Sequence, residues 1–209
     1  HRERPRPEVA AAVEVLGGCL ARLERVQGMG SLHGVEGTGS AAYFQAFRAL
    51  LKQDLGFVAR ARRPPTDPVN AMLSFGYTLL LHNVQAALHT VGLDPYQGYL
   101  HALAYARPSL ALDLMEEFRG ILVDSVVLRL VNTLAVGPEH FSPTETGGIY
   151  LNEEGKRQFL PAFEERMATK VLYEGVGQVP YRHCLELQAR RLARVVLGRE
   201  PEYRPMLVK

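Results

Sequence analysis

Apolar residues recur at helical spacing along most of the chain. An amphipathic helix is predicted from about Pro7 to Val26, because hydrophobic residues return there every three or four positions, at Val9, Val13, Leu16, Leu20 and Leu23. Glycines at positions 28, 30, 34 and 37 then break the pattern. A second helix is therefore expected only from Ala41 to Leu51.

The middle of the chain carries clear start and stop signals for helices. Asp67 followed by Pro68 is a strong helix start, since Asp caps the free amides and Pro suits the first helical position. This helix should end at Gly92, after roughly twenty-four residues. A further long helix is predicted from Pro108 to about Thr133, and residues 137–148 should form a loop.

The last third predicts two more helices and little strand. Asn152 can cap a helix that continues to about Ala168, and the final helix should run from Pro180 to Leu197. Only residues 148–151 and 170–173 look strand-like, and both segments are short. The predicted fold class is all-α: one compact multi-helix catalytic domain of five or six helices over residues 1–209, with residues 199–209 as a C-terminal tail.

Composition fits one folded domain without a membrane span. With 209 residues, of which 47% are hydrophobic, the chain can bury a sizeable core. The most apolar stretch, residues 69–91, contains polar residues such as Asn83 and Gln85, which favours a buried helix over a membrane span. Cys19 and Cys184 have no metal-type spacing and suit reduced thiols in an intracellular protein. Because the first residue is His1 and not Met, we expect the chain to begin partway through a larger protein.

Net charge is only +2, but arginines are clustered. One cluster is Arg60, Arg62 and Arg63, and another is Arg190, Arg191 and Arg194. Such clusters are compatible with binding of nucleic-acid phosphates through patches, although solvated surface arginines explain them equally well.

Four polar residues are candidates for chemistry. Asp113 and Glu116 are three apart in a helical pattern, so their carboxylates leave the same face. Two like charges aimed at one point are unfavourable unless a cation lies between them. Together with Glu36 and His101 they would suit Mg²⁺ or Mn²⁺.

Each of these residues also has a plain structural explanation. An acidic pair on a helix is usually solvated, a lone His is usually structural, and Glu36 after a glycine-rich turn could simply carry a charge at the start of a helix. Residues 34–39 lack the Lys of a phosphate-binding loop, and no Ser stands on a strand–turn–helix elbow.

Four ordered blocks resemble the CRISPR-associated spacer-acquisition endonuclease and integrase family (Cas-one). They are Gly34-Val-Glu36-Gly37 leading to Ala42-Tyr43-Phe44, then residues 63–77, then residues 98–119 with His101, Asp113 and Glu116, and finally residues 147–156 with residues 188–205. The resemblance covers nearly the whole chain from about Pro7 onward.

The resemblance implies an α-helical C-terminal catalytic lobe. It implies Glu36, His101 and Glu116 as ligands of Mg²⁺ or Mn²⁺, with Asp113 as a further essential acid that orients a ligand, completes the metal shell or accepts a proton. The implied reaction joins 3′-hydroxyl ends of short DNA fragments, the protospacers, into the CRISPR repeat by transesterification, in the cytoplasm of a prokaryote. The implied partners are double-stranded DNA, a second copy of the chain, and the small adaptation protein Cas-two, with fusion to an upstream domain as a further option.

The chain also departs from that family. The β-rich N-terminal domain has no counterpart in this sequence, and Ala106 stands where the family often has Gly, a change expected to be neutral. The alternatives are a non-catalytic DNA-binding or scaffold module, or a related transposon integrase, which should append an additional DNA-binding domain. Convergence of the four polar side chains would favour an enzyme, whereas separations beyond roughly 10 Å would favour a scaffold. The predicted DNA surface comprises Arg60, Arg62, Arg63, Arg190 and Arg194.

Overall fold

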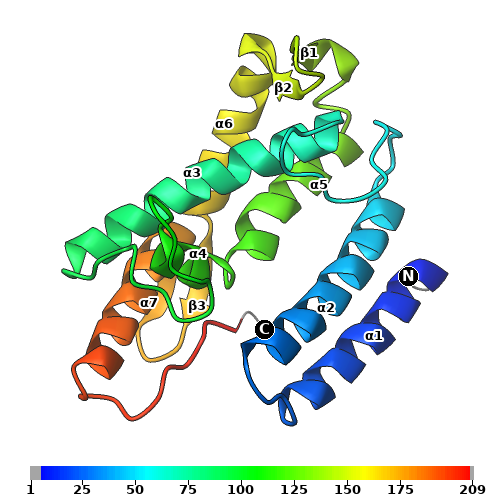
Figure 1. Ribbon diagram of the computed structural model, residues 1–209. Coiled ribbons are helices and arrows are strands. Elements are labelled where there is room, and N and C mark those ends of the chain that lie inside the picture. Colours follow the sequence, from blue (N-terminus) through cyan, green and yellow to red (C-terminus); the bar gives the residue numbers. More distant parts are fainter. Residues whose placement is uncertain (1–5, 208–209) are drawn as a thin grey trace.

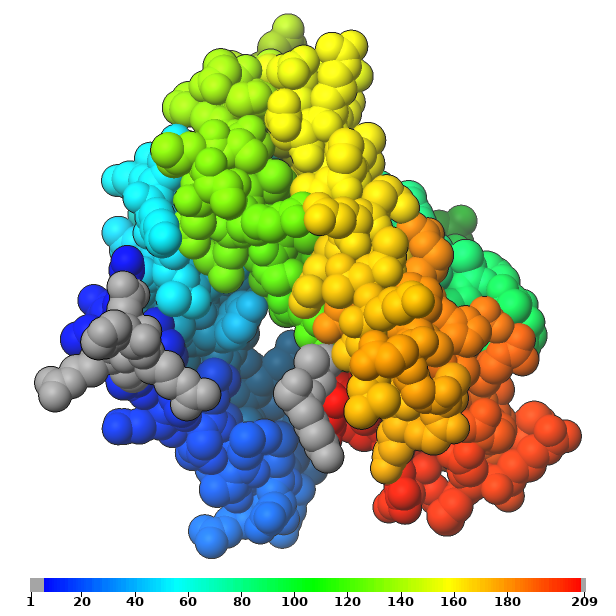
Figure 2. Space-filling model, turned by 180° about the vertical axis from the view of Figure 1, so that it is seen from behind, coloured from blue at the N-terminus to red at the C-terminus, as the bar shows by residue number. Residues whose placement is uncertain are grey.

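The N-terminal quarter of the protein is a helical hairpin that stands beside the remaining elements (Figure 1). The structure is a computed structural model that describes residues 6–207. Helix α1 (Pro7–Leu23) agrees with the predicted first helix, and it packs along α2 (Met29–Leu50). Seen from behind, a hollow separates this hairpin from the C-terminal third of the chain (Figure 2).

Helix α2 corrects the prediction that glycines interrupt the chain before Ala41. The helix begins at Met29, so Gly30, Gly34 and Gly37 lie inside it and Glu36 is in its interior, not at a turn. Packing against α1 explains the difference. At Gly39 an added Cβ would lie 3.5 Å from Leu16 Cδ2, so a small residue lets the two helices approach closely. This packing offsets the low helix propensity of glycine, which costs about 1 kcal/mol per residue relative to alanine.

Helix α3 (Pro68–Thr90) crosses the centre of the molecule and supplies much of the core (Figure 1). Its predicted start is confirmed, because the Asp67 side chain accepts a hydrogen bond of 2.9 Å from the Asn70 amide. Its predicted end is also confirmed, with Gly92 in the left-handed region at φ 77°. The side chains of Met72, Leu80 and other α3 residues are fully buried, as expected of a core helix. Within residues 6–207 no helix has the length and apolar character needed to cross a membrane.

The helix predicted from Pro108 to Thr133 is not continuous. It consists of α4 (Ser109–Met115), the π-helical segment η1 (Arg119–Asp124) and α5 (Ser125–Asn132). The wide π turn leaves Leu122 and Val123 in the core while Asp124 reaches two tyrosine hydroxyls from other helices. Apolar periodicity could not reveal this interruption, since Phe118, Leu122 and Val126 continue the helical spacing through it. π turns of this kind are frequent at functional sites.

The C-terminal part combines two helices with two short antiparallel strand pairs. In chain order the elements are η2 (Pro138–His140), β1 (Phe141–Pro143), β2 (Ile149–Leu151), α6 (Glu153–Ala168), β3 (Lys170–Tyr173), β4 (Gly177–Pro180) and α7 (Tyr181–Val196). β1 pairs with β2, and β3 pairs with β4. The predicted cap of α6 is confirmed by the Asn152 side chain, which accepts from the Gly155 amide at 2.9 Å.

The all-α fold class is confirmed, although the described residues contain seven α-helices instead of five or six. After α7 the chain continues without regular structure and returns to the turn between α4 and η1, where Glu117 accepts hydrogen bonds from the Tyr203 hydroxyl and the Met206 amide. The predicted tail extends to Lys209, and its last two residues lie outside the described part of the chain.

Candidate active site

Asp113 holds the loop that carries His101. Its Oδ2 accepts hydrogen bonds from the amides of Tyr99 and Leu100 at 2.6 and 3.0 Å, and its Oδ1 accepts from the His101 amide at 2.9 Å. Oδ1 also lies 2.6 Å from His101 Nδ1. Gly98 makes this approach possible, because a Cβ there would lie 2.5 Å from the Ser109 side chain.

These contacts determine the charge of Asp113 and the orientation of His101. Burial alone would raise the pKa of Asp113, but the backbone amides and the imidazole outweigh it and hold the pKa below its ordinary value. An ionised Asp113 makes His101 Nδ1 the donor, so that Nε2 of a neutral imidazole carries the free lone pair. Both Asp113 oxygens are thus occupied within the protein.

Glu116 approaches the other side of the same imidazole. Its Oε1 lies 3.9 Å from His101 Nε2 and 2.9 Å from Arg119 Nη1. This buried oxygen accepts no hydrogen bond of good geometry despite the nearby guanidinium. Burial raises the pKa of Glu116, Arg119 and His101 oppose the rise, and the negative charge of Glu36 adds to it. Glu116 therefore presents an oxygen that is paired with Arg119 but accepts no hydrogen bond, next to an imidazole nitrogen.

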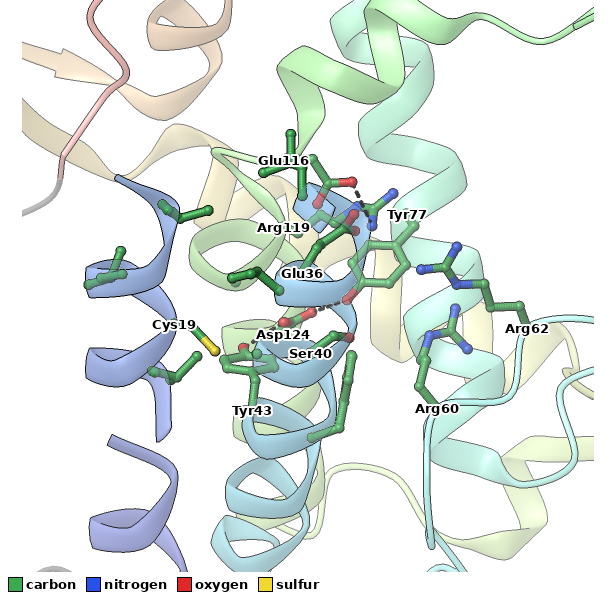
Figure 3. Close-up of a pocket in the computed structure, with 18 residues that line it drawn as sticks. Cys19, Glu36, Ser40, Tyr43, Arg60, Arg62, Tyr77, Glu116, Arg119 and Asp124 are labelled. Carbon is green, nitrogen blue, oxygen red and sulfur yellow. Dashed lines mark hydrogen bonds and ion pairs between the residues drawn. The ribbon is translucent and has the colours of Figure 1, made fainter. Parts of the chain in front are cut away.

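Glu36 faces Glu116 across a pocket of about 640 Å³ between the hairpin and the central helices (Figure 3). The hairpin side of this pocket is mostly apolar, with Leu16 and Leu20 among its residues. The opposite side carries Glu116, Arg119 and two residues of the connection before α3, Arg60 and Arg62. The pocket therefore combines acidic groups with arginines.

Arg60 is the most firmly held of these arginines. It donates to Asn70 Oδ1 at 2.8 Å and to Ser74 Oγ at 3.0 Å, and its guanidinium lies 5.4 Å from the centre of the Tyr77 ring. Arg119 lies 5.0 Å from the same ring centre. Two cations thus stand at the pocket around one aromatic side chain, an arrangement that favours a bound anion.

Three polar residues of the pocket were not foreseen from the sequence. Tyr43 and Tyr77 donate hydrogen bonds of 2.6 Å to the two oxygens of Asp124. Burial raises the pKa of Asp124 although the two hydroxyls favour its ionised form. The sequence offered one sign of this cluster, a tyrosine seven positions after Glu36. Its partner Asp124 lies 81 residues after Tyr43, so no local pattern connects the two.

The donor set fits a hard divalent cation in its chemistry. His101 Nε2 and Glu116 Oε1, which accepts no hydrogen bond, are a nitrogen and an oxygen ligand. Asp113 supplies the carboxylate that such a histidine normally requires, and Glu36 offers a further oxygen on the pocket that Glu116 lines. In the part of the chain that the structure describes, no three such groups lie at coordinating distance. A three-ligand site therefore requires these side chains to come closer together.

The remaining predicted site residues divide between two regions. Arg63 is exposed on the connection before α3, next to Arg62. Arg190 and Arg194 lie on α7 beside Thr90 and Val91, in a depression separate from the pocket of Glu36. Each is paired with a carboxylate: Arg190 Nη2 is 2.6 Å from Glu186 Oε1, and Arg194 Nε is 2.5 Å from Glu200 Oε1. The structure thus brings Arg60 and Arg62 to the candidate site and leaves the α7 pair apart from it.

Ala106, expected to be neutral, occupies a position that favours glycine. Its φ of 55° lies in the left-handed region, where an L-residue with a Cβ is strained by roughly 1–2 kcal/mol. The loop between His101 and α4 therefore carries local strain.

Fold and site together define an all-α domain with a pocket that carries acidic residues and arginines, next to a histidine that approaches Glu116. A model of the family described as CRISPR associated protein Cas1 matches residues 1–165. The chain belongs to this family.

Relatives and solved structures agree with the assignment. A CRISPR-associated endonuclease Cas1 of Thermus thermophilus is 46% identical over 197 residues, which cover 94% of this chain and 59% of that protein. The structure of a casposase bound to integration product has a TM-score of 0.85 at 27% identity, covering 97% of this chain and 64% of the other. A Cas6-RT-Cas1–Cas2 complex has a TM-score of 0.86 at 25% identity, covering all of this chain and 23% of the matched chain. The chain spans about six-tenths of the length of the Thermus relative.

Proposed function

We propose that this chain is the catalytic lobe of a metal-dependent DNA endonuclease and integrase of CRISPR adaptation. It would join the 3′-hydroxyl ends of short DNA fragments to the CRISPR repeat. The observation that carries the proposal is the convergence of Asp113 and Glu116 on opposite nitrogens of His101, with Glu36 on the same pocket. Family membership and the likeness to a casposase with its integration product support this assignment.

The reaction exchanges one phosphodiester for another. The 3′-oxygen of the incoming fragment forms a bond to a phosphorus of the repeat, and the bond from that phosphorus to the 3′-oxygen of the repeat strand breaks. The attacking hydroxyl loses its proton, and the departing 3′-oxygen gains one. A bound Mg²⁺ or Mn²⁺ would supply neutralisation of the charge that develops on the phosphate.

The protein residues would have separate tasks in this reaction. Glu36, His101 and Glu116 would hold the cation. Asp113 would keep His101 in the tautomer that presents Nε2, because both its oxygens are already engaged. Arg62 and Arg119, which line the same pocket, would attract and orient the phosphate.

Two alternatives remain distinct from this proposal. A non-catalytic scaffold would not need an imidazole between two carboxylates beside a third acidic residue, so the geometry favours the enzyme. A transposon integrase shares the chemistry, and the casposase likeness keeps it as the second candidate. The substrate separates the two: an adaptation enzyme should integrate into a CRISPR repeat, whereas a transposase should require its own element ends.

The partners follow from the proposal. We expect double-stranded DNA, a second copy of the chain and a Cas2-type protein, since the chain is similar to the Cas1 part of a Cas1–Cas2 complex. A protein that acts on a CRISPR array would work in the cytoplasm of a prokaryote.

The proposal is tested with the complete protein. Strand transfer of a labelled fragment into repeat DNA should require Mn²⁺ or Mg²⁺, and it should be lost in His101→Ala and Glu116→Ala. Glu139→Ala is a suitable control, because this exposed glutamate does not line the pocket and its carboxylate forms an ion pair with His140. Wild-type activity in both site variants would overturn the assignment.

A further inference from the structure

Asp124 is a buried carboxylate to which the proposed chemistry assigns no task. Only 2% of its surface is exposed. Its Oδ2 accepts a hydrogen bond from Tyr43 and its Oδ1 accepts one from Tyr77, both at 2.6 Å. Burying a carboxylate is costly, and apolar residues of similar volume often stabilise a fold as well or better. The cluster is therefore weakly explained by stability alone.

The position of the cluster relative to the acidic site residues is specific. Tyr43 follows Glu36 by seven residues within α2, so both side chains lie on nearly the same helix face, about 10 Å apart along the axis. Asp124 follows Glu116 by eight residues at the end of the π turn. The Tyr43–Asp124 hydrogen bond thus joins the helix of Glu36 to the segment that follows Glu116, two turns away from each carboxylate. All four residues line the same pocket (Figure 3).

Glu36 needs such a support because the like charge of Glu116 repels it. Both carboxylates line the same pocket. Beyond the hairpin, α2 is also held near its C-terminal end, where Asn132 donates to the Leu50 carbonyl at 3.0 Å and the rings of Phe47 and Phe57 lie 5.8 Å apart. Within the described residues, α2 forms hydrogen bonds to elements outside the hairpin at Tyr43 and at Leu50. The Tyr43 bond is nearer to Glu36 along the helix.

Tyr77 completes the support from the opposite side. It extends from α3, and its ring lies between the guanidinium groups of Arg60 and Arg119 at 5.4 and 5.0 Å. Arg119 is in turn 2.9 Å from Glu116. Asp124 therefore accepts a hydrogen bond from a tyrosine on each of two helices that border the pocket. One of these helices, α2, carries Glu36.

We infer that Tyr43, Asp124 and Tyr77 form a positioning cluster that holds Glu36 opposite Glu116. The cluster does not touch the reacting phosphate. It fixes the rotation of α2 about its axis and the distance between the N-terminal half of α2 and the π turn. These two quantities decide whether Glu36 can join His101 and Glu116 around one cation. This role rests on the proposed function.

The test compares two tyrosine variants of the full-length protein. Tyr43→Phe removes one hydroxyl from the cluster. Tyr173→Phe is the matched control, since the Tyr173 hydroxyl donates a buried 2.6 Å hydrogen bond to Gln188 away from the pocket. Three quantities are measured: the Mn²⁺ dissociation constant by electron paramagnetic resonance, hydrogen–deuterium exchange of residues 29–42 without metal, and the thermal unfolding midpoint.

Tyr43→Phe should weaken Mn²⁺ binding about tenfold or more, the size of effect seen when groups that orient ligands are lost, and should speed exchange in residues 29–42. Tyr173→Phe should leave both unchanged while lowering the unfolding midpoint to a similar extent. If Tyr43→Phe does not fold, Asp124→Asn, which keeps one acceptor oxygen, takes its place with the same expectations.

Wild-type Mn²⁺ affinity and unchanged exchange in the cluster variant would overturn the inference, as would equal effects from the Tyr173 control. If the wild-type protein binds no Mn²⁺, the proposed function fails instead. The exchange measurement still decides whether the cluster holds the N-terminal half of α2.

Discussion

His101 Nδ1 lies 2.6 Å from Asp113 Oδ1, and this contact decides which face of the imidazole is available. The same carboxylate accepts a hydrogen bond from the His101 amide, so the imidazole ring and the backbone of His101 are held together. Asp113 is therefore a residue that orients His101 and does not itself face the pocket of Glu36. Of the three roles considered from the sequence, we propose this one.

Asp113→Asn should weaken Mn²⁺ binding by roughly 10- to 100-fold and reduce strand transfer accordingly. The reason is that an amide cannot accept from all three backbone amides and the imidazole as the carboxylate does, so His101 loses its fixed tautomer. Titration of the metal-free protein with Mn²⁺, followed by paramagnetic resonance, measures the change.

Asp94→Asn is the control for Asp113→Asn. Asp94 caps a neighbouring turn by accepting the Tyr96 amide at 2.9 Å, so Asp94→Asn removes a charge near the same loop and keeps the capping oxygen. Equal Mn²⁺ affinity in the Asp113 variant and the wild type would contradict the orienting role.

Arg62→Ala should weaken binding to duplex DNA of any sequence and lower the slope of log affinity against log salt by about 1. Arg62 is exposed and lines the pocket, so a phosphate can reach it, and a phosphate contact carries no base code. Fluorescence anisotropy titrations at several salt concentrations give the slope.

Arg190→Ala combined with Arg194→Ala should change DNA affinity less than Arg62→Ala alone. Both arginines are already paired with glutamates and lie in a depression away from the pocket. A larger loss in this double variant would show that the main DNA surface includes α7.

The free energy of unfolding should carry a pH dependence from Asp124. Because burial raises its pKa in the folded protein above the value in the unfolded chain, the folded state binds the proton more tightly. This contribution to stability is present at low pH, declines as pH rises from the unfolded pKa near 4 through the raised folded pKa, and is constant above that. Urea unfolding across this interval should show a smaller decline for Asp124→Asn than for the wild type; identical curves would contradict the assignment.

Two glycine substitutions should have opposite effects on stability. Gly34→Ala should stabilise by up to about 1 kcal/mol, since Gly34 is exposed inside α2 and its Cβ would meet nothing within 4 Å. Gly76→Ala should destabilise by about 1–3 kcal/mol, because its Cβ would lie 2.5 Å from Val123 Cγ1 and 2.9 Å from Phe159 Cζ in the core. Denaturant unfolding measures both. A destabilised Gly34 variant would indicate that α2 is not helical at this position in solution.

Local signals were sufficient for most helix boundaries. The Asp67 cap and the glycine after α3 act within a few residues of the helix end, so the sequence contains the whole cause. The glycines of α2 misled the prediction because contact with α1 stabilises that helix. The π turn was missed because apolar residues continue at helical spacing through it, and the tyrosines on α2 and α3 that bond Asp124 at its end lie far from Asp124 in the chain.

By itself the sequence determined most of the helices, the family and four polar candidates for the site, Glu36, His101, Asp113 and Glu116, since these depend on short-range pattern and on residue type. Only the tertiary structure decided their roles. It turned both Asp113 oxygens toward the His101 loop, left Glu116 Oε1 without a hydrogen bond, and placed Arg60 and Arg62 beside Glu116. Hydrogen bonds and burial depend on distances across the fold, and such distances arise only when helices far apart in the chain pack against one another.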